Sequence, residues 1–156
     1  MKISFDLDDT LVCRQNNIPQ EPNPIPFFLK PWFREPLRAG TCQLMTTLRK
    51  QSHEICIYTS SYRSPFYIRC WFWLYGITLG EVINQTVHNQ HLQNSQRRDR
   101  PSKDPRLFGI HLHIDDSEGV KQEGKKLGFR VCQISPQDDC WVTRVFEEVQ
   151  GLSDRF

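Results

Sequence analysis

Three aspartates lie close together near the start of the chain. Residues 5–12 read FDLDDTLV, so Asp6, Asp8 and Asp9 directly follow a short apolar run, 3–5. Crowded carboxylates repel one another and raise each other's pKa, which is a cost to the fold. At the end of a strand, residues two apart can present one side chain and one backbone carbonyl to a common point. A shared cation would neutralise the acids and remove the cost.

A second acidic pair follows a later apolar run. Asp115 and Asp116 come directly after 110–114. If the two runs are neighbouring strands, Asp116 joins Asp6 and Asp8 in a set of hard oxygen ligands. Mg²⁺ suits such a set best, because it takes few protein ligands and keeps water and phosphate oxygens around it. The sequence therefore predicts a magnesium site.

Strands and helices alternate along the chain. The runs that predict strands are 2–5, 54–58, 81–83, 110–114 and 129–134. The helical patterns are 41–51, 65–75, 117–127 and 141–150. This alternation predicts an α/β, three-layer Rossmann-like fold with a mainly parallel five-stranded sheet and helices on both faces. Ligands bind such sheets beyond the carboxyl ends of the strands, which is where the polar residues after each run fall.

Two segments fall outside the alternation. Residues 13–40 form an insertion, whose part 13–36 holds six of the ten prolines, and residues 84–102 form a polar loop. Both are of loop size, so we predict a single domain over 1–156 without a cap domain. The insertion either closes over the site as a flap or packs against the body. The helix at 66–75 is apolar almost all round and is expected to be buried.

The bulk properties exclude some classes of protein. The formal net charge of +2 does not indicate any particular class of binding partner. No apolar run approaches the ~20 residues that span a bilayer. The six cysteines form no C-x-x-C pair, so we expect neither disulfides nor zinc but free thiols in a reducing cytoplasm. His111 and His113 have metal-ligand spacing on a strand, but we expect them to be structural. Asp9 is expected to be a turn residue.

Four motifs, in order and over nearly the whole chain, resemble those of the haloacid dehalogenase (HAD) superfamily. Residues 6–10, DLDDT, resemble the first motif. The strand that ends in Thr59 and Ser60 resembles the second, and Lys103 followed by an aspartate resembles the third. The acidic pair at 115–116 resembles the fourth. The resemblance is to the magnesium-dependent phosphatases without a cap.

The resemblance implies a role for each residue. Asp6 would be the nucleophile that forms an aspartyl-phosphate, and Asp8 would be the general acid and base. Thr59, with the amide of Ser60, would hold the phosphate oxygens. Lys103 would neutralise charge on Asp6 and on the phosphoryl group.

The resemblance also implies the metal ligands. Mg²⁺ would bind Asp6, the carbonyl of Asp8 and a phosphate oxygen. We expect Asp116 to contact the metal, and Asp115 either to orient Lys103 or a metal-bound water or to be the alternative ligand. Asp8 separates the chain from the dehalogenases of the superfamily, which lack this second acid and need no metal.

The function implied is a Mg²⁺-dependent phosphomonoester hydrolase of the cytoplasm. Its phosphorylated substrate is either a macromolecule, which an open site admits, or a small molecule enclosed by a partner subunit. One alternative is a non-catalytic or regulatory module that keeps the metal site. Another is a nucleic-acid end-processing phosphatase, for which Arg97, Arg98 and Arg100 are the support. We expect this basic run to be a solvated loop.

Overall fold

The computed structural model describes residues 1–15, 17–94 and 101–154. The basic run with Arg97, Arg98 and Arg100 lies outside the described residues, so the prediction made for it stays a prediction. None of the described helices is long and apolar enough to cross a membrane. All six cysteines are free thiols, as the sequence predicted.

The described residues form one parallel sheet of five strands. These are β1 (Lys2–Phe5), β2 (Glu54–Tyr58), β3 (Val82–Ile83), β4 (Leu112–Asp115) and β5 (Val131–Gln133). Their order is β3-β2-β1-β4-β5, and every pair is parallel. Strand β1 is central, with Phe5 opposite both Ile57 and Ile114. The predicted α/β fold is therefore confirmed.

The direction in which strands are added to the sheet reverses at β1. From β1 the chain first builds outward through β2 to β3, and then crosses to the other side of β1 for β4 and β5. In a doubly wound sheet this reversal opens a crevice beyond the carboxyl ends of the central strands. The residues after β1, β2 and β4 therefore meet at one place.

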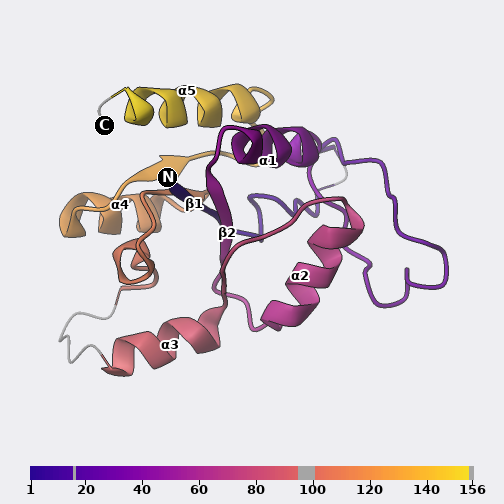
Figure 1. Ribbon diagram of the computed structural model, residues 1–156, viewed down its shortest axis with the longest axis horizontal. Helices are drawn as coiled ribbons and strands as arrows, with labels where there is room; N and C mark the ends of the chain where they lie inside the picture. The colour runs from indigo at the N-terminus through magenta and orange to yellow at the C-terminus, as the bar shows by residue number, and fades with distance from the viewer. Residues whose placement is uncertain (16, 95–100, 155–156) are drawn as a thin grey trace.

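Helices cover both faces of the sheet. They are α1 (Thr41–Lys50), α2 (Pro65–Leu74), α3 (Gln85–Asn94), α4 (Glu118–Leu127) and α5 (Trp141–Ser153), with a 3₁₀ turn η1 (Pro105–Phe108) before β4. Helices α1 and α5 lie side by side on one face, and α4 lies on the other side of β1 and β5 (Figure 1). This is the arrangement that right-handed crossovers produce when the winding direction reverses.

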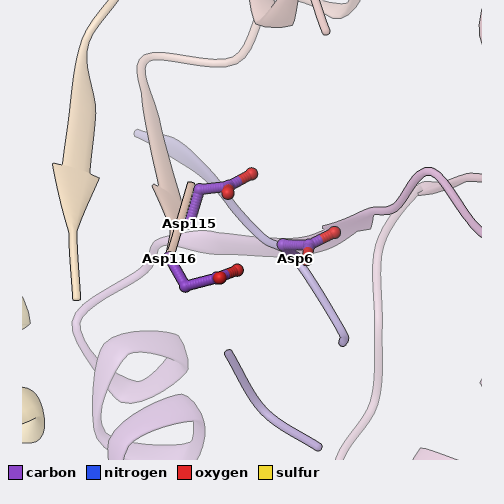
Figure 2. A group of neighbouring side chains, drawn as sticks. All are labelled: Asp6, Asp115 and Asp116. Carbon is purple, nitrogen blue, oxygen red and sulfur yellow. The ribbon is translucent and has the colours of Figure 1, made fainter. Parts of the chain in front are cut away.

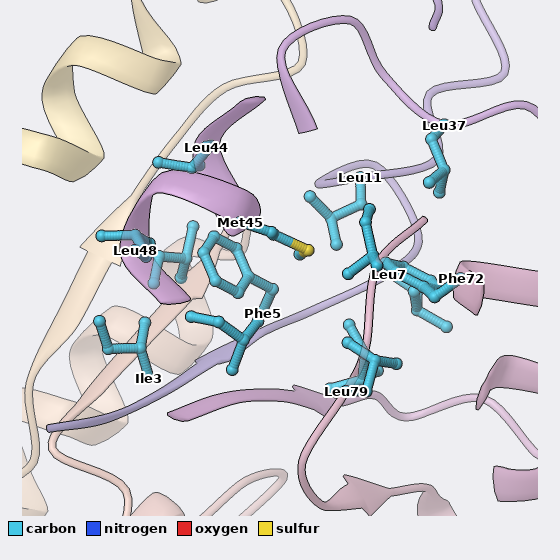
Figure 3. Close-up of a cluster of buried hydrophobic side chains, with 14 of the residues drawn as sticks. Ile3, Phe5, Leu7, Leu11, Leu37, Leu44, Met45, Leu48, Phe72 and Leu79 are labelled. Carbon is cyan, nitrogen blue, oxygen red and sulfur yellow. The ribbon is translucent and has the colours of Figure 1, made fainter. Parts of the chain in front are cut away.

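The larger core lies between β1 and helix α1. Leu44, Met45 and Leu48 point from one side of α1 onto Ile3 and Phe5 of the central strand, and all five are fully buried (Figure 3). Burying a side chain of this size contributes about 1.5–3 kcal/mol. This packing holds the end of β1, and with it the acids that follow, in a fixed position.

Helix α3 occupies part of the segment that we had expected to be a polar loop. Asn84 caps it, because the Asn84 side chain accepts a hydrogen bond of 3.0 Å from the amide of Val87. His88 is buried on its inner face and bonds to the hydroxyl of Tyr58 at 2.6 Å. The cap Asn84 can be recognised in the sequence, but the contact of His88 with Tyr58 cannot. Without that contact, the polar stretch 85–94 shows little helical amphipathicity.

Helix α2 starts as expected but is less buried than expected. The side chain of Ser64 accepts a hydrogen bond from the amide of Tyr67, and Pro65 takes the first helical position. Phe66 and Trp73, however, are 77% and 70% exposed, so the expectation of burial all round is wrong for them. These two apolar side chains of the helix are therefore open to solvent.

The insertion 13–40 packs against the body at several points. Its described residues form no helix or strand beyond one isolated bridge, between Gln20 and Arg38. Ile25 and Leu37 are buried, and the ring of Phe33 stacks on Tyr67 of α2 at 5.0 Å between ring centres. Phe27, by contrast, is 83% exposed. The segment is therefore anchored to α2 and the core, with exposed aromatic side chains between the anchors.

Candidate functional site

Three carboxylates gather beyond the ends of β1 and β4. Asp6 follows β1, and its amide donates to the carbonyl of Ile114 at 2.9 Å. Asp115 is the last residue of β4, and Asp116 follows it. Each of the three aspartates offers one oxygen, and these oxygens lie within 4.8 Å of one another (Figure 2). The parallel sheet thus brings together acids that are more than a hundred residues apart.

Lys103 bridges two of these acids. Its Nζ donates to Asp6 Oδ1 at 2.7 Å and to Asp115 Oδ2 at 2.6 Å, and the residue is only 4% exposed. The next residue, Asp104, donates its amide to the hydroxyl of Tyr58 at 2.8 Å and is fully buried. Because Tyr58 is the last residue of β2, this contact fixes the backbone that carries Lys103 against the sheet.

His113 forms a buried hydrogen bond with the carboxylate of Asp115. The imidazole is fully buried on β4, with Nε2 2.9 Å from Asp115 Oδ2 and Nδ1 2.8 Å from the hydroxyl of Ser4. Burial lowers the pKa of His113, so the ring is neutral. A neutral ring that donates from Nε2 accepts from Ser4 at Nδ1. His113 is therefore structural, and its task is to hold the carboxylate that holds Lys103.

The two acids beside Lys103 differ in their pKa. Burial raises the pKa of Asp6 to about 6, although the charge of Lys103 opposes the shift. Burial would raise the pKa of Asp115 too, but the hydrogen bond from His113 and the charge of Lys103 outweigh it and lower that pKa. Burial favours neutral Lys103, yet the charges of Asp6 and Asp115 raise its pKa. At neutral pH the group is thus Lys⁺ between two carboxylates.

The donor set fits a divalent cation. Both oxygens of Asp115 already accept hydrogen bonds, Oδ2 from Lys103 and His113 and Oδ1 from the amide of Ser117 at 2.8 Å. Asp116 Oδ1 accepts a longer bond of 3.2 Å from Thr10, and burial, then the charge of Asp115, raises the pKa of Asp116. A cation would relieve that cost. The contacts therefore favour Asp116 over Asp115 as the ligand beside Asp6.

The end of β2 supplies hydroxyl and amide groups. Thr59 is 1% exposed, and its Oγ1 accepts a hydrogen bond of 3.1 Å from the amide of Ser61. Ser60 is exposed. The hydroxyl of Ser61 is buried and has no hydrogen-bond partner among the described residues. A buried hydroxyl without a partner is costly in a folded protein, so this one is available for a ligand.

Asp8 lies outside the three-carboxylate group. Its two oxygens each accept a bond of 2.9 Å from Arg63, in a bidentate pair. This hydrogen bonding by Arg63 lowers the pKa of Asp8. Arg63 in turn donates to Glu35 of the insertion, from Nε at 3.0 Å and from Nη2 at 2.8 Å. Asp9 occupies a turn with φ 60°, consistent with its expected role.

Sequence reasoning missed the pair of Arg63 with Asp8. The residue stands four positions after Thr59 and directly before the cap of α2, so its place at the sheet edge could have been inferred. Its partners could not, because Glu35 belongs to an insertion without regular structure. An arginine that follows the second polar strand end is the signal that was available.

No protein-family model matches the sequence, and no curated protein matches it either. Solved structures do share its fold. A chain of the Pnkp1/Rnl/Hen1 complex has a TM-score of 0.55 at 15% identity, over 85% of this chain and 45% of that one. This chain thus spans less than half of that relative.

Two further structures match over almost their whole length. A predicted HAD-like family hydrolase from Porphyromonas gingivalis has a TM-score of 0.52 at 13% identity, over 96% of this chain and 97% of its own. The HAD domain of the effector protein Lem4 from Legionella pneumophila, an inactive mutant, has a TM-score of 0.52 at 13% identity, over 95% and 91%. With its parallel sheet ordered β3-β2-β1-β4-β5, this chain has the fold of the HAD-like hydrolases.

Proposed function

We propose that the protein is a phosphomonoester hydrolase that works through an aspartyl-phosphate on Asp6. The observation that carries the proposal is the buried bridge of Lys103 between Asp6 and Asp115. A structural ion pair needs one carboxylate, whereas this cation is shared between two at the open end of a sheet. A fixed positive charge beside a buried carboxylate is what transfer of a phosphoryl group requires, because charge spreads over the phosphoryl oxygens in the transition state.

The proposed reaction has two steps. A carboxylate oxygen of Asp6 attacks phosphorus, the bond from phosphorus to the ester oxygen breaks, and protonated Asp8 gives its proton to the leaving alcohol. A water oxygen then attacks the phosphorus of the aspartyl-phosphate and gives a proton to Asp8. The bond from phosphorus to the Asp6 oxygen breaks, so inorganic phosphate leaves and the Asp6 carboxylate is regenerated. Thr59, the Ser60 amide and Lys103 would hold the phosphoryl oxygens.

Mg²⁺ is the proposed cofactor. Asp6, Asp116 and the carbonyl of Asp8 would hold it, and it would supply positive charge to the phosphoryl group. The support is the set of oxygen ligands within 4.8 Å together with the raised pKa values of Asp6 and Asp116. Asp115 would keep Lys103 oriented.

The test is hydrolysis of a panel of phosphomonoesters that includes p-nitrophenyl phosphate. Wild type should release phosphate with Mg²⁺ and stop on addition of chelator, and Asp6→Asn should be inactive. Asp139→Asn, which removes an exposed carboxylate away from the site, is the matched control and should keep full activity. Well-folded wild type that binds Mg²⁺ but turns over none of the panel would favour the non-catalytic module.

A further inference from the structure

A pocket of about 380 Å³ opens beside Asp8. It is lined by Asp8, Asp9, Val12, Arg14, Ser61 and Arg63. Two arginines and one serine thus line one small space. The proposed reaction uses none of these three residues.

The backbone and side chain of Arg63 are held independently of Asp8. The side-chain Nδ2 of Asn84 donates to the Arg63 carbonyl at 3.1 Å, and Ser64 caps helix α2 directly after Arg63. The guanidinium makes two hydrogen bonds to Glu35 on its other edge. Arg63 therefore stays aimed at the pocket when Asp8 moves.

Asp8 must leave Arg63 before it can act as an acid or base. Both of its oxygens are held by the guanidinium, while a general acid needs a protonated oxygen directed at the leaving group. Asp8 is partly exposed, with 41% of its side chain accessible, so it has room to turn. Its departure would leave the Nη1 and Nη2 donors of Arg63 open towards the pocket.

The groups left behind favour an anion. Arg14 Nη2 lies 3.6 Å from Asp8 Oδ1 and 3.0 Å from Glu35 Oε1, so the two arginines would share the single carboxylate of Glu35. Ser61 lines the same pocket, and its buried hydroxyl has no hydrogen-bond partner among the described residues. Guanidinium groups bind carboxylate and phosphate oxygens in pairs, and the space that Asp8 vacates has that shape.

We propose that Arg63, with Arg14 and Ser61, forms a subsite for a second phosphate group of the substrate. The second phosphate takes the place of the Asp8 carboxylate on Arg63 and so releases Asp8 to the reacting bond. Because Asp8 serves the leaving oxygen, the second phosphate belongs to the leaving group. The substrate class is a phosphomonoester whose alcohol carries another phosphate nearby. The inference rests on the proposed hydrolysis at Asp6.

The test compares substrates that differ only in the second phosphate. One pair is 1,3-propanediol bisphosphate and its monophosphate, and the other is thymidine 3′,5′-bisphosphate and thymidine 3′-phosphate. The readout is the ratio of kcat/KM for bisphosphate over monophosphate, which divides out changes in the basal reaction. We expect wild type to prefer at least one bisphosphate, and Arg63→Gln to reduce that preference about ten- to hundredfold. Arg63→Lys should retain part of the preference, because lysine keeps the positive charge but lacks the paired N–H donors of the guanidinium.

Arg34→Gln is the matched control, because it removes an exposed arginine of the insertion that does not line the pocket. It should keep the wild-type ratio. Preference for the propanediol compound alone assigns the subsite to small bisphosphates, and preference in both pairs extends it to nucleotides. A ratio near one in wild type, or a ratio that Arg63→Gln leaves unchanged while it only lowers the melting temperature, overturns the proposal and makes Arg63 structural.

Failure of the proposed hydrolysis would look different. Neither member of a pair would then be turned over, and the subsite is judged by calorimetric titration of the same pairs into Asp6→Asn protein. Tighter binding of a bisphosphate that is lost on adding Arg63→Gln supports the subsite without catalysis. Equal binding of both members overturns it.

Discussion

Replacing Lys103 by methionine removes a buried charge while keeping most of the side-chain volume. The ammonium group is the shared partner of Asp6 and Asp115, at 2.7 and 2.6 Å, in a place where Lys103 is 4% exposed. Removing one partner of a buried ion pair costs about 3–5 kcal/mol, because the remaining charge is left uncompensated. In a domain of this size each kcal/mol lowers the melting temperature by about 2–4 °C. Lys103→Met should therefore melt roughly 10 °C below wild type.

The assays are thermal and urea unfolding at pH 7.5 with chelator, so that no added metal compensates the acids. The matched control is Lys30→Met, an exposed lysine of the insertion, which should stay within about 0.5 kcal/mol of wild type. The double variant Lys103→Met/Asp115→Asn removes one of the two stranded carboxylates and should recover a large part of the loss. The charge balance inferred at Lys103 is refuted if Lys103→Met lowers the free energy of unfolding by less than about 1 kcal/mol. It is also refuted if the double variant is no more stable than Lys103→Met alone.

Three further predictions concern the acids and the residue beneath them. Since burial raises the pKa of Asp6 to about 6, its ionisation weakens the metal-free fold as pH rises from about 4 through 6. Asp6→Asn should thus melt higher than wild type at pH 7.5 in chelator, with the gain shrinking as pH falls and gone below about pH 4; a constant difference across that range contradicts this. Saturating Mg²⁺ should raise the melting temperature of wild type, since a ligand at 100 times its Kd adds about 2.7 kcal/mol. Asp116→Asn should lose most of that rise and the exposed Glu118→Gln should keep it, so an equal rise in both counts against the site. His113→Ala should cost about 2–4 kcal/mol in urea unfolding, because two buried polar groups lose a partner, whereas the exposed His111→Ala should cost much less.

The alternation of elements and the strand-end acids were predictable because both depend on short-range patterns. A buried parallel strand is a run of apolar residues, and the polar residue that ends it lies at the ligand-binding edge whatever the rest of the chain does. Asp6, Thr59 and the pair Asp115-Asp116 could be placed at that edge for this reason. Helix α3 could not be placed, because its inner face is polar and is stabilised by the contact of His88 with Tyr58.

The partners of the acids were decided by the tertiary structure. In the sequence, Asp8 was one of three similar aspartates, and Lys103 was singled out by the resemblance of its motif and not by any local pattern. Folding places Lys103 between Asp6 and Asp115, and it places Asp8 on Arg63. These contacts join segments 12 to 97 residues apart, and no local period reports on such distances. The sequence by itself determined which acids reach the sheet edge, and the packing of the loops around that edge decided which cation each acid meets.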